Sequence, residues 1–319
     1  MYIIFMKKLL ALKMAAIACA VFMAIGFAHA ANVEEIDAPS AAMNKSIPAI
    51  VILPDSYEKS ADARYPVLYL LHGFGGNHQM WIRIKPDLQR IASLYNMIIV
   101  CPDGATSWYW DSPKNPEIRY QTYVADELVK LIDSKYRTIP SREGRAITGL
   151  SMGGHGGLWL GINRPDVFGA CGSMSGGVDI RPFPYNWNMA KNLGPYAENK
   201  DIWDTHTVMN IINKISATPI KIIIDCGTAD IFHDVNAKLH EKLLYYNIPH
   251  DYISRPGAHN AQYWNNSIDY QALFFAKFFA QARRKIAQGR QNKYSATPRG
   301  IRKISRAFCG YATIKKIAR

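Results

Sequence analysis

The chain has 319 residues, of which 49% are hydrophobic and 20% charged, and its net charge at pH 7 is +13. Its length suits one large α/β domain of roughly 250 residues with terminal segments. The stretch 282–319 contains twelve Lys or Arg and no acidic residue, whereas the rest of the chain is close to neutral. A nucleic-acid partner is therefore not expected, because the basic charge is confined to the end of the chain.

The first thirty residues have the composition of a secretory signal peptide. Lysines precede an apolar run over 14–27, and Ala28-His29-Ala30 offers small residues to a signal peptidase. The run of about 15 apolar residues is shorter than the roughly 20 that cross a bilayer. The sequence therefore predicts cleavage of a signal peptide over 1–30 and export to the periplasm or the extracellular space, without a stable membrane anchor.

Short aliphatic runs then alternate with helical patterns, which predicts an α/β fold with a mostly parallel central sheet flanked by helices. Strands are expected at 49–53, 67–72, 97–101, 145–149, 169–174, 220–225 and 251–255. Helices are expected at 87–94, 120–135, 152–162, 205–215, 234–246 and 268–285, the last one burying Leu273. Between Gly177 and Thr205 the periodicity fades, which indicates a long excursion over the sheet. We predict a catalytic domain over 31–287 and a basic, disordered tail over 288–319.

The cysteines of the predicted domain lie in or beside predicted central strands. Cys101, Cys171 and Cys226 are therefore expected to be buried thiols and not disulfides. Their spacing does not fit a zinc site, and no metal is expected.

The clearest chemical motif is Gly149-Leu150-Ser151-Met152-Gly153, a G-x-S-x-G sequence between a predicted strand and a predicted helix. A serine on so sharp a turn exposes its hydroxyl, and the glycines remove side chains that would collide with the strand or the helix. The motif predicts Ser151 as a nucleophile. The alternative is a glycine-rich helix start that packs closely on the sheet.

A serine nucleophile needs an imidazole to accept its proton and a carboxylate to orient that imidazole. His259 is the candidate base, because it follows the last predicted strand at the edge where ligands meet parallel sheets. The acid should lie between them in sequence. Asp230 is favoured because it lies in an exposed loop, with Asp225 and Asp234 as alternatives.

Two backbone amides are expected to stabilise the oxyanion of the reaction. Met152, directly after the serine, supplies one of them. The glycine-rich turn His72-Gly73-Phe74-Gly75-Gly76 supplies the other, with Phe74 as the donor. Taken alone, this segment would also fit an ordinary turn between a strand and a helix.

With these motifs the chain resembles the Putative esterase family of α/β-hydrolases, which includes S-formylglutathione hydrolases, tributyrin, feruloyl and acetyl xylan esterases, and mycolyltransferases. The resemblance covers approximately residues 40–285. Its motifs are Leu70-Leu71-His72-Gly73-Phe74-Gly75-Gly76, Pro102-Asp103-Gly104, Ser107-Trp108-Tyr109, the Ser151 motif, Ser173-Met174-Ser175-Gly176-Gly177, Asp225-Cys226-Gly227-Thr228-Ala229-Asp230 and Pro256-Gly257-Ala258-His259. It implies an α/β-hydrolase fold, a triad of Ser151, Asp230 and His259, an oxyanion hole at Phe74 and Met152, and no cofactor.

The resulting hypothesis is an exported serine carboxylesterase that acts on a small-molecule or polysaccharide-linked ester, such as an acetyl or feruloyl ester. Aromatic residues that could stack on the substrate are Trp108, Tyr109, Trp110, Tyr263 and Trp264, although core positions would explain them equally well. The alternatives are a thioesterase of the S-formylglutathione hydrolase type and an acyltransferase of the mycolyltransferase type. A binding module without activity is disfavoured because every catalytic position is filled.

Overall fold

The computed structural model describes residues 32–295. The predicted signal peptide and most of the predicted basic tail lie outside these residues. By its internal contacts the chain divides after Phe279 into two units, and the first contains the whole sheet and the candidate site.

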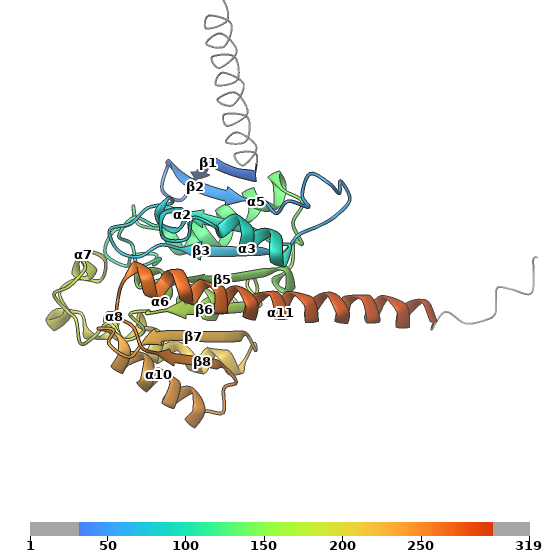
Figure 1. Cartoon of the computed structure of the whole chain (residues 1–319). Helices are drawn as coiled ribbons and strands as arrows, with labels where there is room; N and C mark the ends of the chain where they lie inside the picture. Colours follow the sequence, from blue (N-terminus) through green and yellow to red (C-terminus); the bar gives the residue numbers. More distant parts are fainter. Residues whose placement is uncertain (1–31, 296–319) are drawn as a thin grey trace, which may run out of the picture. The chain divides into compact units, whose positions relative to one another are not determined.

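The described residues form an eight-stranded sheet in the order β1-β2-β4-β3-β5-β6-β7-β8 (Figure 1). Its strands are β1 (Val33–Ser40), β2 (Lys45–Ile52), β3 (Val67–Leu71), β4 (Ile98–Pro102), β5 (Arg145–Gly149), β6 (Ala170–Met174), β7 (Lys221–Gly227) and β8 (Asp251–Arg255). The pairs β1–β2 and β2–β4 are antiparallel, and every pair from β4 to β8 is parallel. The mostly parallel sheet predicted from the sequence is confirmed.

Strand β1 was not expected from its sequence. Its segment VEEIDAPS contains two glutamates, an aspartate and a proline, which are all uncommon in strands. It forms because it pairs along its whole length with β2, from Val33 opposite Ile52 to Ser40 opposite Lys45. Pairing with a neighbour therefore overrides a weak local preference.

The helices lie between these strands in the alternation that the sequence predicts. They are α2 (Met80–Ile84), α3 (Leu88–Tyr95), α4 (Tyr120–Thr122), the π-helical η2 (Tyr123–Leu128), α5 (Val129–Lys135), η3 (Arg142–Gly144), α6 (Met152–Asn163), α7 (Met189–Leu193), η4 (Tyr196–Glu198), α8 (Lys200–Thr205), α9 (Val208–Ile211), η5 (Ile212–Ser216), α10 (His233–Tyr245) and α11 (Ala261–Ser295). None of the helices between residues 32 and 295 is long and apolar enough to cross a membrane. Helix α11 begins seven residues before the predicted start at 268 and extends ten beyond the predicted end at 285.

Two hydrophobic clusters cover the two faces of the sheet. Alternate residues of β3 point to opposite faces, so Tyr69 and Leu71 join one cluster and Leu68 joins the other. Helices α5, α6, α9 and α10 pack on the first face, and α2, α3 and α11 pack on the second. Figure 1 shows α3 and α11 over the sheet, roughly along the direction of its strands. The buried side of α11 carries Phe275, whereas Leu273, predicted to be buried, is 41% exposed.

The predicted excursion begins where β6 ends and contains α7 and α8. Figure 1 shows both helices beyond the ends of the parallel strands. The three predicted thiols, Cys101, Cys171 and Cys226, are unpaired and buried, as expected. Burial raises the pKa of each thiol, which makes them structural groups and poor nucleophiles.

A buried histidine joins α6 to an aromatic cluster. The ring of His155 is stacked on Trp159 at 5.9 Å and stands edge-on to Trp108 and Trp110 at 5.4 and 5.1 Å. Its Nδ1 lies 3.2 Å from the carbonyl oxygen of Gly177, to which a neutral ring can donate. Burial lowers the pKa of His155 to about 3, because the charged ring would have to leave water.

This histidine should make the protein less stable in acid. Between pH 6.5 and about 3 the unfolded chain binds a proton at His155 and the folded chain does not, so the free energy of unfolding should fall by up to about 1.4 kcal/mol per pH unit. His155→Phe preserves an aromatic ring and removes the titration. Denaturant unfolding of both proteins at pH 7, 6 and 5 gives the free energy of unfolding. This free energy should fall less steeply with decreasing pH in the variant, and an equal fall in both proteins would contradict the lowered pKa of His155.

Candidate active site

Ser151 lies on a strained turn between β5 and α6. Its φ of 54° and ψ of −115° are rare for a residue with a side chain, and such strain costs about 1–3 kcal/mol. Two backbone bonds hold the turn, from the Ser151 amide to the Met174 oxygen at 2.9 Å and from the Leu150 amide to the Leu71 oxygen at 3.2 Å. A Cβ at Gly153 would lie only 2.4 Å from the Leu71 oxygen, so glycine lets α6 begin directly against the sheet.

Ser151, His259 and Asp230 form a continuous hydrogen-bonded chain. His259 Nε2 lies 3.0 Å from Ser151 Oγ, and His259 Nδ1 lies 3.0 Å from each carboxylate oxygen of Asp230. Since the carboxylate can only accept, the imidazole carries its proton on Nδ1 and leaves Nε2 to accept the serine proton. The side chain of Asp230 is fully buried and that of His259 is 20% exposed.

The loops that carry the acid and the histidine are joined through their backbones. The amide of Thr228 donates to Arg255 at 2.9 Å, and the amide of Ala229 donates to Gly257 at 2.9 Å. Asp230 Oδ1 also accepts the amide of Phe232 at 2.8 Å. The carboxylate is therefore fixed by the chain around it before it contacts His259.

The two alternative acids lie elsewhere. The buried carboxylate of Asp225 accepts from Arg255 Nη2 at 2.7 Å and from the Tyr263 hydroxyl, and burial raises its pKa. The side chain of Asp234 is 90% exposed and lies beside His233. Neither aspartate contacts the imidazole of His259, so the geometry selects Asp230.

The predicted oxyanion turn lies directly on the serine turn. A Cβ at Gly73 would lie 3.4 Å from that of Ser151. The amide of Gly76 donates to the Gly73 oxygen at 3.0 Å and Gly75 has a φ of 76°, which describes a type II turn with Phe74 at its second position. Met152 begins α6, and the first amides of a helix have no acceptor within that helix. Both predicted donors are thus carried by segments that adjoin Ser151.

Three of the predicted substrate contacts are core residues, which corrects that expectation. Trp108, Tyr109 and Trp110 are at most 1% exposed. The two indoles are stacked on each other at 5.7 Å, and the Tyr109 hydroxyl donates to the His72 oxygen at 3.1 Å. They support the site from inside and have no exposed face for a substrate.

The other two predicted contacts differ from each other. Tyr263 is buried and its hydroxyl donates to Asp225, so it also belongs to the supporting structure. Trp264 is half-buried, and its ring stands perpendicular to that of His259 at 4.9 Å. Of the five aromatic residues, Trp264 is the one that the structure brings to the triad.

An aromatic cluster beside His259 was not predicted. Phe232 stands edge-on to His259 at 5.4 Å, and Phe183 and Trp187 from the excursion each lie 5.2 Å from Phe232. Phe232 is buried, whereas Phe183 and Trp187 are partly exposed. Aromatic residues in the excursion were visible in the sequence, but nothing in their spacing showed that the chain folds back toward the histidine.

Within the part of the chain that the structure describes, no group of three or more His, Cys, Asp or Glu side chains is placed to hold a metal ion. The arrangement of the described side chains is instead that of a nucleophile, a general base and an orienting acid, beside two candidate oxyanion donors. Such a site is suited to acyl transfer.

Comparisons with known proteins agree with this class of site. Residues 40–275 match the family described as "Putative esterase", and the chain belongs to this family. An esterase of Mycobacterium tuberculosis strain H37Rv is 28% identical over 235 residues, which are 66% of this chain and 51% of that protein. The chain thus spans about half the length of this relative. An acetyl esterase of Caldicellulosiruptor saccharolyticus is 25% identical over 252 residues, 73% of this chain and 94% of that protein.

Solved structures confirm the α/β-hydrolase fold. The serine hydrolase FphF of Staphylococcus aureus, described as fluorophosphonate-binding, has a TM-score of 0.69 and 20% identity, with 76% of this chain and 98% of that chain covered. A ferulic acid esterase has a TM-score of 0.65 and 25% identity, with 77% and 98% covered.

Substituting the two buried aspartates separately should separate catalysis from stability. In Asp230→Asn the imidazole loses the acceptor that fixes its tautomer, so kcat for ester hydrolysis should fall by about 10⁴-fold. In Asp225→Asn the Arg255 and Tyr263 bonds weaken, so the free energy of unfolding should drop by about 1–3 kcal/mol while kcat is retained. Steady-state kinetics and denaturant unfolding measure both effects. A large loss of kcat in Asp225→Asn alone would show that the acid is assigned to the wrong residue.

Proposed function

We propose that the protein is an exported serine carboxylesterase that works through an acyl-enzyme on Ser151. The observation that carries this proposal is the unbroken chain from Ser151 Oγ through both nitrogens of His259 to the carboxylate of Asp230. Family membership supports an ester as substrate. The predicted signal peptide supports export, which also disfavours an intracellular glutathione thioester.

The proposed reaction has two halves. His259 Nε2 accepts the proton of Ser151 Oγ as the oxygen attacks the ester carbonyl, and Asp230 stabilises the imidazolium that forms. The amides of Phe74 and Met152 stabilise the oxyanion, and His259 then protonates the departing alcohol. In the second half, water gives a proton to His259 and attacks the acyl group, so that the acid is released and Ser151 recovers its proton. The proposed steps use side chains and amides of this chain and water.

For the substrate we propose an ester with an aromatic acyl group, either a small molecule or one linked to a polysaccharide. Phe183 and Trp187 present partly exposed rings that are joined to His259 through Phe232. A flat acyl group can stack on such rings, which is worth about 0.5–1.5 kcal/mol per aromatic contact. The ferulic acid esterase among the similar structures supports the same choice.

The serine assignment is tested by Ser151→Ala. The wild-type protein, recovered from the periplasm or medium with Ala31 as its expected amino terminus, should hydrolyse p-nitrophenyl acetate and methyl ferulate. The variant should lose at least about 10⁴-fold in kcat, because no other group can form the acyl-enzyme. A folded wild-type protein without activity would contradict the proposal. Products containing an added alcohol in place of free acid would identify an acyltransferase instead.

The aromatic acyl preference is tested by Trp187→Ala. Loss of this ring should lower kcat/KM for methyl ferulate by about threefold to tenfold, and should leave kcat/KM for p-nitrophenyl acetate unchanged, because the acetyl group is too small to reach the ring. Tyr185→Ala is the matched control, since Tyr185 lies in the same segment and is 96% exposed. Equal effects of Trp187→Ala on the two esters would contradict the preference.

A further inference from the structure

We infer that His72 is a positioning residue that orients the peptide group whose N–H is the Phe74 oxyanion donor. This inference rests on the proposed function, because it concerns the oxyanion site of that reaction. His72 follows β3 directly and is 1% exposed. In the triad chemistry it takes no part, so its burial and contacts need a separate explanation.

Both ring nitrogens of His72 are occupied by backbone groups. The amide of Gly104 lies 2.7 Å from Nε2, and the carbonyl oxygen of Gly73 lies 2.7 Å from Nδ1. An amide N–H can only donate, so Nε2 is the acceptor and the ring proton lies on Nδ1. His72 therefore donates from Nδ1 to the Gly73 oxygen.

That oxygen belongs to the same peptide group as the Phe74 amide. A peptide group is planar, and a trans group directs its C=O and its N–H in opposite directions. The Gly73 oxygen accepts two hydrogen bonds, from His72 Nδ1 and, at 3.0 Å, from the Gly76 amide. These two donors hold the plane, and they thereby fix the direction of the Phe74 N–H on a turn that lies against Ser151. Hydrogen bonding at the oxygen also strengthens the amide as a donor through cooperative polarisation.

The loop after β4 holds the ring from the other side. The Gly104 amide makes this contact. The carboxylate of Asp103 lies 3.4 Å from the unprotonated Nε2, which donates nothing to it, and accepts the amide of Ala105 at 2.7 Å. The hydroxyl of Ser107 donates to the Gly104 oxygen at 2.6 Å. The Pro102-Asp103-Gly104 segment thus fixes the His72 ring through the Gly104 amide, and the ring in turn donates to the Gly73 oxygen of the oxyanion turn.

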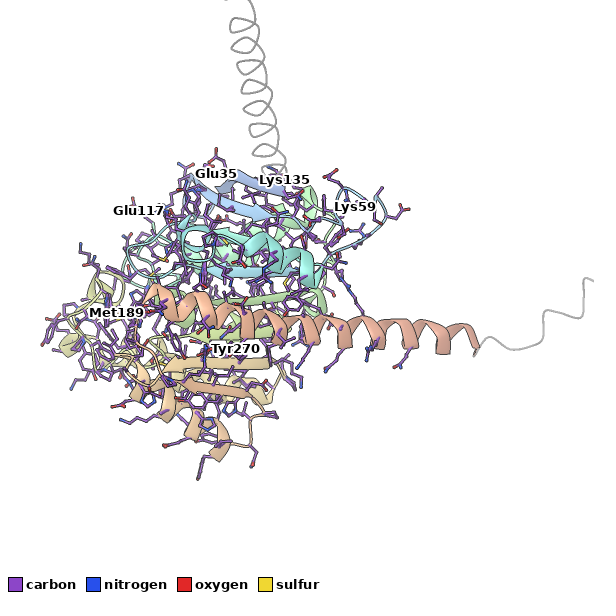
Figure 2. The ribbon with its side chains drawn as sticks, viewed as in Figure 1. Glu35, Lys59, Glu117, Lys135, Met189 and Tyr270 are labelled. Carbon is purple, nitrogen blue, oxygen red and sulfur yellow. The ribbon has the colours of Figure 1, made fainter. Side chains whose placement is uncertain are left out.

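A second histidine provides a matched control. His78 lies six residues further along and is also buried. Its Nε2 lies 3.1 Å from a carboxylate oxygen of Glu35, and its Nδ1 lies 3.9 Å from one of Asp103. Figure 2 shows Glu35 on β1, at the edge of the sheet. His78 thus shares a carboxylate with His72, but its contacts lead toward β1 and not to the Gly73 peptide group.

Two substitutions at position 72 separate the two bonds of the ring. In His72→Asn the amide nitrogen lies near the place of Nδ1, so it can still donate to Gly73 but loses the bond to Gly104. In His72→Gln the amide oxygen reaches the place of Nε2, so the bond from Gly104 is retained and the donor to Gly73 is lost. We expect kcat for p-nitrophenyl acetate to fall about tenfold to a hundredfold in His72→Gln, less than the 10²–10³-fold that follows complete loss of an oxyanion donor.

His72→Asn and the control His78→Asn should retain kcat within about threefold, and KM should be unchanged in all three variants, because the oxyanion forms only after the substrate is bound. Thermal unfolding of each variant is measured beside the kinetics to show whether the variant is folded. The inference is overturned if His72→Gln retains kcat, or if both substitutions at position 72 lower kcat equally. If His72→Gln does not fold, the test is the kcat of His72→Asn. A fall in that kcat of more than about threefold relative to the wild-type protein refutes the inference. Inactivity of the wild-type protein would instead refute the proposed function, and this inference with it.

Discussion

The close contact between the start of α6 and the end of β3 is the constraint on which the rest of the site depends. Gly153 leaves no room for a side chain next to the backbone oxygens of Leu71 and His72. This contact holds Ser151 in its strained conformation and brings the oxyanion turn against it. Ser151 and the candidate oxyanion turn are thus parts of a single packing arrangement.

The sequence predicted which three residues form the hydrogen-bonded chain because Ser151, His259 and Asp230 are placed by local geometry. Strands β5 and β8 have the predicted ends, and Ser151 and His259 directly follow them or the short turns after them. Asp230 could be chosen over Asp225 because Asp225 lies within β7 and Asp230 lies in the loop after it. The expected exposure of Asp230 was wrong, since its side chain is buried. The aromatic predictions depended on which rings face outward, and this is set by contacts distant in sequence. Trp108 and Trp110 are buried by His155 and the excursion, which no local pattern encodes.

Asp225 on β7 and Asp230 in the loop that follows are two buried carboxylates with different purposes. Asp225 is neutralised by Arg255, and its second oxygen is occupied by the Tyr263 hydroxyl, so it joins β7 to β8 and to α11. Asp230 accepts one backbone amide and has its remaining capacity directed at His259. The difference lies in the available partners and not in burial, since both side chains are buried. A carboxylate without a fixed cation is the one that can stabilise a transient imidazolium.

The triad and the partly exposed rings of Phe183 and Trp187 are supported by different parts of the chain. Backbone hydrogen bonds join the acid loop to the histidine loop, and the serine turn is bonded to β3 and β6. These groups therefore keep their geometry through the rigid sheet, as preorganised electrostatic stabilisation requires. Phe183 and Trp187 instead belong to the excursion after β6, whose contacts to the triad pass through Phe232. The excursion contributes rings near the triad but none of its three members. If the proposed function holds, changes in the excursion should alter which acyl group is accepted more than the reaction itself.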